Sequence, residues 1–137
     1  MAELPKTKKS IVLRTDFTDD TTWSTVCSGV SNPENNSRVS VEFVNDPQFD
    51  RITIDALLDL IPPSSRKTFI FLVDEKTIAE SDHPILVIDL LQDRGRTFRV
   101  LPSVTAAVER NLATANMDWE DFALNTDGDG VYRNFRG

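Results

Sequence analysis

Positions 69–73 read Phe-Ile-Phe-Leu-Val, a run of five large apolar residues that leaves few folds open. A short run that is apolar at every position predicts a strand buried on both faces, because a half-exposed strand alternates with polar residues. The run ends at Asp74, where the strand should reach the surface. Such a strand belongs in the middle of a sheet with helices on both sides.

Four further segments have strand character, and helical stripes separate most of them. Residues 11–13 form another apolar run, and residues 39–43 alternate apolar and polar side chains. Residues 85–91 and 97–101 flank a turn at Gly95. The stripes with helical spacing are Trp23, Val26, Cys27 and Val30, then Ile54, Leu57, Leu58 and Ile61, then Val104, Ala107, Val108 and Leu112. This alternation predicts an open α/β sheet.

We expect a single α/β domain at residues 10–137, preceded by a flexible, lysine-rich N-terminal arm at residues 1–9. The domain should have three layers, with helices on both faces of a mostly parallel sheet. Right-handed crossovers and the expected burial of the strands suggest the order 2-1-3-4-5, with strand 5 antiparallel. This order predicts a crevice at the carboxyl ends of strands 1 and 3.

Charge and composition restrict the partners and the compartment. The 137 residues include 15 Lys and Arg against 22 Asp and Glu, a formal net charge of −7. Nucleic acids and anionic membranes are bound through a basic face, so we expect neither as a partner. No apolar run approaches the roughly 20 residues of a membrane span. With one cysteine and no signal-like stretch, we expect a soluble, cytoplasmic protein.

Charged side chains should gather at the predicted crevice. The residues expected there are Arg14, Asp16, Asp19 and Asp74. No cofactor is predicted outright, but the oxygens of Asp16, Asp19 and Asp74 are the ligands that Mg²⁺ prefers. The set is similar to the acidic pocket of response-regulator receiver domains, although Leu101 replaces the lysine that ends their fifth strand. The alternative is structural: Asp74 begins a turn, and a helix is capped by Thr18, Asp19 and Asp20.

Asp89 is unusual because it interrupts the apolar segment 85–91. Burying a carboxylate without a partner costs several kcal/mol, so an arginine should lie nearby. If Leu91 pairs with Arg96, then Arg96 lies diagonal to Asp89, and a register shifted by one residue places Arg99 opposite it. We predict a polar network of Asp89, Arg96 and Arg99, with anion binding by the arginines as the alternative.

Three other features are expected to be structural. Residues 125–130 match the first half of a calcium loop, but the twelfth position is Arg136 where a glutamate is needed. His83 should lie at the opposite rim of the sheet from the crevice, with no nucleophile beside it. Cys27 lies on an apolar helical stripe and should be unreactive.

Several sequence blocks together carry a family resemblance. Among them are Arg14-Thr15-Asp16-Phe17, Phe71-Leu72-Val73-Asp74, His83-Pro84-Ile85-Leu86, Gly95-Arg96-Thr97-Phe98-Arg99 and Asp129-Gly130-Val131-Tyr132-Arg133. From about Ile11 to Phe135 the chain resembles a small family of uncharacterised bacterial-type domains of unknown function. The resemblance implies no activity, cofactor or ligand.

Three hypotheses for function follow. The leading one is a noncatalytic, acidic α/β interaction or ligand-binding module, because a nucleophile–base pair and a Gly-rich phosphate loop are both missing from the sequence. The second is a Mg²⁺-dependent hydrolase or phosphotransfer enzyme that uses Asp16, Asp19 and Asp74. The third is an oligomer-forming accessory protein that pairs through the edge segment 39–43. The partner, a protein or a small ligand, and the oligomeric state are left open.

Overall fold

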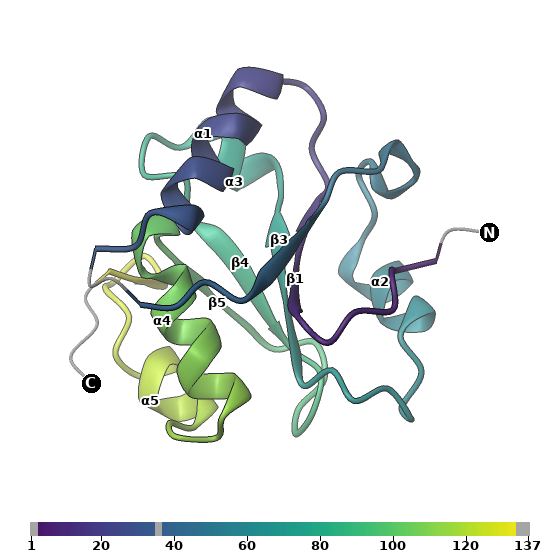
Figure 1. Cartoon of the computed structure of the whole chain (residues 1–137), viewed down its shortest axis with the longest axis vertical. Coiled ribbons are helices and arrows are strands. Elements are labelled where there is room, and N and C mark those ends of the chain that lie inside the picture. Colours follow the sequence, from purple (N-terminus) through teal and green to yellow (C-terminus); the bar gives the residue numbers. More distant parts are fainter. Residues whose placement is uncertain (1–2, 35–36, 134–137) are drawn as a thin grey trace.

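A computed structural model of the chain describes residues 3–34 and 37–133, and it contains a mixed sheet flanked by helices (Figure 1). The strands are β1 (Ser10–Arg14), β2 (Val41–Val44), β3 (Phe69–Val73), β4 (Ile85–Asp89), β5 (Thr97–Val100) and β6 (Val131–Tyr132). The helices are α1 (Asp20–Ser31), the 3-10 helix η1 (Pro47–Phe49), α2 (Ile54–Leu60), α3 (Glu75–Ala79), α4 (Pro102–Ala113) and α5 (Trp119–Ala123).

The strand order is β2-β1-β3-β4-β5-β6, which confirms the predicted order and the open α/β sheet. β1 is parallel to both β2 and β3, and β5 is antiparallel to β4 as expected. β4 is also antiparallel to β3, so β4 runs against the other strands, whereas strand 5 was expected to be the reversed one. The connection at residues 74–84 is shorter than the dozen or more residues that a parallel crossover needs. β6, which was not expected as a strand, adds parallel to β5.

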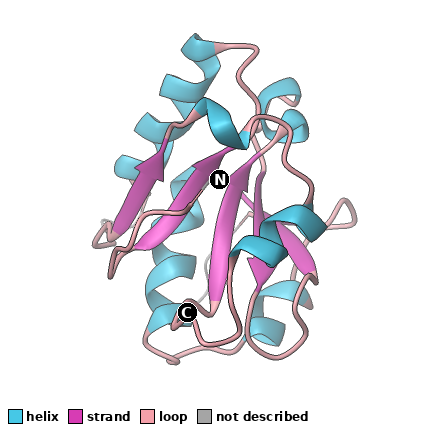
Figure 2. Ribbon diagram, turned by 90° about the vertical axis from the view of Figure 1, so that its right-hand side faces the viewer, coloured by secondary structure: helices cyan, strands magenta, loops and turns pink. Residues whose placement is uncertain are grey.

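The core is divided by the sheet into two layers, visible on either side of the strands in Figure 1. Side chains of α1, α4 and α5 cover one face, and those of α2 and η1 cover the other. The five residues of β3 are all buried and alternate between the two layers, with Phe71 in the first and Ile70 in the second. This is the arrangement predicted for the apolar run at 69–73. Figure 2 shows the strands side by side with helices in front and behind.

The N-terminal arm is expected to be flexible, and in its described part Leu4, Thr7 and Lys9 make contacts; residues 1 and 2 lie outside the described residues. Leu4 packs against the core layer beneath α2. The Lys67 ammonium donates hydrogen bonds to the carbonyl oxygens of Thr7, at 2.6 Å, and of Lys9. These contacts fasten the arm beside the start of β3.

None of the helices in the described residues is long and apolar enough to cross a membrane.

Candidate functional site

Arg14, the last residue of β1, is buried at the edge of the sheet where β1, β2 and β3 end. Its Nε donates to the Asp16 carbonyl oxygen at 3.0 Å, Nη1 to Asn45 Oδ1 at 3.2 Å, and Nη2 to Asp20 Oδ1 at 2.7 Å. The guanidinium carbon lies 4.4 Å from the centre of the Phe17 ring, within the range of a cation–π contact. Arg14 therefore holds together the segment that leads from β1 into α1.

Asp16 and Asp19 are committed to the turn and the helix that follow β1. Asp16 Oδ1 accepts hydrogen bonds from the Thr18 amide at 2.8 Å and the Thr18 hydroxyl at 2.6 Å. Asp19 is the N-cap of α1 and accepts from the Thr22 amide at 3.0 Å and hydroxyl at 2.7 Å. These hydrogen bonds lower the pKa of Asp19 because they favour its charged form. Asp19 therefore has the capping role of the structural alternative, whereas Asp16 closes the turn that precedes the helix.

Asp74 begins α3 and is bound by an arginine. Its carboxylate accepts from the Thr77 amide and hydroxyl, and from Arg99 through Nη1 at 2.9 Å and Nη2 at 2.8 Å. Burial alone would raise the pKa of Asp74, but the hydrogen bonds and charge of Arg99, with Thr77, leave it lowered. Its oxygens are therefore directed to groups of the protein itself.

The predicted carboxylate cluster is not formed. Within residues 3–34 and 37–133, no three Asp, Glu, His or Cys side chains are placed to hold a metal ion together. Asp16, Asp19 and Asp74 are thus not grouped as shared ligands in the described residues, and cation binding by them stays a prediction. Each carboxylate is drawn to its own helix N-terminus or turn, where unpaired amides attract it.

Asp89 lies at the opposite end of the strands from Arg14 and Asp74. Of its two predicted partners, Arg96 contacts it. The register pairs Ile88 with Thr97, which brings Arg96 directly opposite Asp89 and differs from both registers considered above. Arg96 Nε lies 2.7 Å from Asp89 Oδ2. The prediction that Arg99 joins this network is wrong. Arg99 lies at the other end of β5 and pairs with Asp74.

The Asp89 carboxylate also fixes the turn between β4 and β5. Oδ1 accepts from the Leu91 amide at 2.9 Å, and Oδ2 accepts from the Asp93 amide at 3.1 Å. Burial acts to raise the pKa of Asp89, but these amides and Arg96 lower it overall. Arg96 extends the network, since its Nη1 lies 3.0 Å from Glu120 Oε1.

His83 lies at the same rim as Asp74, and the expectation of the opposite rim is wrong because β4 is antiparallel to β3. His83 Nδ1 is 2.9 Å from the Thr77 carbonyl oxygen, so Nδ1 carries the hydrogen. The buried Thr77 hydroxyl lies 2.8 Å from the Pro84 carbonyl oxygen and 3.0 Å from Asp74 Oδ1, so its one hydrogen is donated to one of these oxygens at a time. The His83 side chain therefore stabilises the loop between α3 and β4 and is not directed at a nucleophile.

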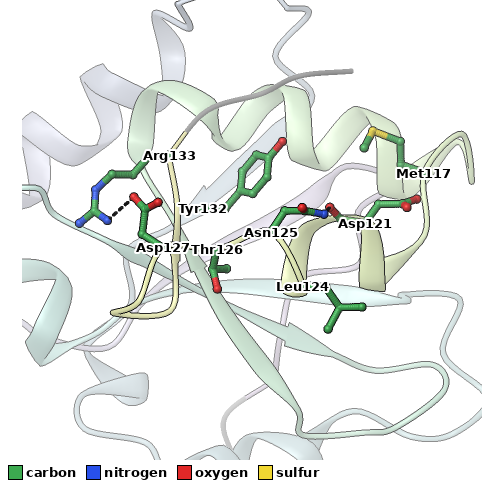
Figure 3. Close-up of a pocket in the computed structure, with 8 residues that line it drawn as sticks. All are labelled: Met117, Asp121, Leu124, Asn125, Thr126, Asp127, Tyr132 and Arg133. Atoms are coloured by element: carbon green, nitrogen blue, oxygen red, sulfur yellow. Dashed lines mark hydrogen bonds and ion pairs between the residues drawn. The ribbon is translucent and has the colours of Figure 1, made fainter.

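The described surface includes two hollows that bear on the candidate site. The larger, about 490 Å³, is lined by Met117, Asp121, Leu124, Asn125, Thr126, Asp127, Tyr132 and Arg133 (Figure 3). Arg133 binds Asp127 at 2.9 Å and Asp129 at 2.7 Å, so a guanidinium pairs with two carboxylates of the loop at 125–130. Arg136 lies outside the described residues. Sequence reasoning missed this ion pairing, although an arginine closely follows the two aspartates.

The smaller hollow has a volume of about 110 Å³, and the Asp89–Arg96 pair forms part of its wall. It is lined by Thr68, Phe69, Asp89, Leu91, Gln92, Arg96, Leu112, Ala115, Met117, Asp118 and Trp119. We call it the Leu91 cleft. The sequence indicated the ion pair but not the apolar residues around it, because they come from the ends of β3, β4 and α4, which are far apart in the chain.

The chain was also compared with known proteins. A family described as "Domain of unknown function (DUF6924)" matches residues 9–135. No curated protein matches the chain.

Proposed function

The chain belongs to this family of unknown function, and we propose that it is a noncatalytic interaction module that binds a positively charged protein segment. The observation that carries the proposal is the occupation of the candidate carboxylates. Asp16 and Asp19 cap local turns, and Asp74 is bound by Arg99. A general base or metal ligand needs an oxygen directed at a substrate or an ion, and these oxygens are directed elsewhere.

The charge of the chain supports a cationic partner. A net charge of −7 favours association with a basic protein and disfavours nucleic acid and anionic membranes. The single cysteine is consistent with a reducing compartment, so we place the module in the cytoplasm. The competing function, a Mg²⁺-dependent hydrolase or phosphotransfer enzyme, requires Asp16 and Asp74 to leave their present partners.

Metal titration separates these two functions. Calorimetry with MgCl₂ and MnCl₂ should give only the heat of dilution, and a simple aryl phosphate should not be hydrolysed faster than in buffer. The variants Asp16→Asn and Asp74→Asn should leave both results unchanged. Metal binding or turnover that both variants abolish would contradict the proposal and establish the enzyme.

Binding itself is tested with a library of fluorescent peptides that share one positive charge but differ in sequence. Anisotropy should find affinities that depend on sequence at about 0.15 M ionic strength, where distant charges are largely screened. Binding that is equal for all sequences and disappears at this salt concentration would contradict a specific interaction module.

A further inference from the structure

The Leu91 cleft combines an exposed leucine with a small apolar hollow. Leu91 is 65% exposed, and large apolar side chains this exposed are few in the described residues. Half-buried Leu112 and Met117 line the same hollow, together with buried Trp119. An exposed apolar group beside an apolar hollow is a feature of surfaces that contact a partner.

The position of Leu91 is fixed rather than free. Its amide donates to Asp89 Oδ1, and the amide of Gly95 donates to the Asp89 carbonyl oxygen at 2.9 Å. Arg96 closes the turn through its amide, which donates to the Asp93 carbonyl oxygen at 3.1 Å, and through its ion pair with Asp89. These bonds fix the backbone at Leu91, and a backbone held in place before binding loses less entropy when it is covered.

The size of the cleft argues for a side chain as its occupant. Its volume of about 110 Å³ is well below the roughly 300–1,000 Å³ of pockets that enclose small molecules. A larger partner can insert one side chain there and contact Leu91 with the rest of its chain.

The surroundings of the cleft are acidic. Of the described residues that line it, Asp89 and Asp118 carry carboxylates and Arg96 carries the guanidinium. Glu120 and Asp93 adjoin it and are exposed. Arg96 pairs with Asp89 and Glu120, at 2.7 and 3.0 Å, and exposed Arg94 lies in the same turn as Asp93, so the four carboxylates outnumber the two arginines. The rim therefore favours positive charge on the partner.

We propose that the Leu91 cleft is the docking site of the module and takes one aliphatic side chain flanked by basic residues. This inference rests on the proposed function and specifies its partner chemistry. Leu91 and Met117 cover the aliphatic group, while Asp93 and Asp118 face the basic residues beside it. The buried Asp89 has a role in this arrangement, because it presents Leu91 on a rigid turn.

The test uses amide chemical-shift mapping by NMR on the full chain. The probe is an acetylated pentapeptide with a central leucine between two pairs of lysines. We expect its addition to shift the amides of Leu91, Gln92, Arg96 and Met117. A peptide with a central serine should bind about tenfold more weakly, since it loses the burial of an aliphatic side chain. A peptide with glutamates in place of the lysines should cause no shifts.

Two matched variants complete the test. Leu91→Ser should weaken the leucine peptide about tenfold, whereas Leu124→Ser, which alters another exposed leucine (79% exposed) outside the cleft, should leave its affinity unchanged. Both side chains are exposed, so the fold should be unaffected.

The outcomes separate this inference from the proposed function. Absence of shifts with the leucine peptide, or shifts that are the same with the serine peptide, overturns the docking site. Library peptides that bind specifically but shift amides outside the cleft overturn the docking site and leave the proposed function standing. Metal-dependent turnover overturns the proposed function, while the leucine peptide still reports on the cleft.

Discussion

Arg99 and Asp74 are joined by two parallel contacts, with Nη1 2.9 Å from Oδ1 and Nη2 2.8 Å from Oδ2. Arg99 is in β5 and Asp74 follows β3, with β4 between these strands. Arg99 Nη1 also donates to the Pro84 carbonyl oxygen, just before β4, at 3.0 Å. One guanidinium therefore fastens three neighbouring strands at the same edge.

The first prediction concerns this pair. Arg99→Lys keeps the charge but removes the two-point geometry, so we expect the free energy of unfolding to fall by about 1–3 kcal/mol. Urea denaturation at pH 7 measures the change. Lys76→Gln is the control: it removes the exposed Lys76–Glu80 pair and should cost about 0.5 kcal/mol or less. Equal losses for the two variants would contradict a special role for Arg99.

The second prediction concerns the close approach of α1 and α4 at Gly29. A Cβ added at Gly29 would lie 2.8 Å from Pro102 Cβ, too near without movement of a helix. Gly29→Ala should therefore lower stability by about 1–3 kcal/mol, although alanine favours helices by up to about 1 kcal/mol.

Gly128→Ala is the matched control for Gly29→Ala, since a Cβ at Gly128 meets no atom within 4 Å. Thermal unfolding of both variants measures the difference. A Gly29→Ala protein that melts at or above the temperature of the original chain would show that the helices separate without cost.

The third prediction concerns pH and Glu109, which is 4% exposed on α4. Burial raises the pKa of Glu109, although a 2.6 Å hydrogen bond from the Ser10 hydroxyl and the charges of Lys67 and Arg110 act to lower it. Because the folded pKa is above the unfolded one, the contribution of Glu109 to stability is fully present below the unfolded pKa. It is lost as the pH rises through the folded pKa.

Glu109→Gln should therefore raise the free energy of unfolding at pH 7, by about 1 kcal/mol, because the amide carries no buried charge. It should also flatten the pH dependence between the unfolded pKa and neutrality. Urea midpoints across this range provide the measurement, with Glu75→Gln on exposed α3 as the control. A variant less stable than the original chain at pH 7 would show that the charge is favourable where it lies.

The fourth prediction concerns the thiol of Cys27, half-buried in α1. Burial raises its pKa to about 11, so little reactive thiolate exists at pH 8. Alkylation by iodoacetamide should be on the order of a hundredfold slower than for a free thiol with a pKa of about 8.5. The rate should recover in urea. Rapid alkylation of the folded protein would mean that the thiol is accessible and ionised.

The strand order and the core were predictable because they depend on local patterns. The apolar run of β3 and the helical stripe through Trp23 and Val30 both act within a few residues. Burial at these positions matches the predictions. Strand direction is different, because it depends on whether a connection can cross the sheet.

The candidate site was less predictable for this reason. The reversal of β4 moves His83 to the edge of Asp74 and separates Arg99 from Asp89. The short connection at 74–84 was an available signal, since it lacks the length for a parallel crossover. The apolar walls of the Leu91 cleft had no such signal, because Phe69, Leu91 and Met117 meet only after the chain has folded.

The strand pairings of this sheet close loops of very different lengths. The β4–β5 pairing joins residues separated only by a turn, whereas the β1–β3 pairing brings together Val12 and Phe71. Closing a short loop loses less chain entropy, and local pairings form faster. The hairpin of β4 and β5, held at its turn by Asp89, therefore costs less chain entropy to close than the pairing that joins β1 to β3.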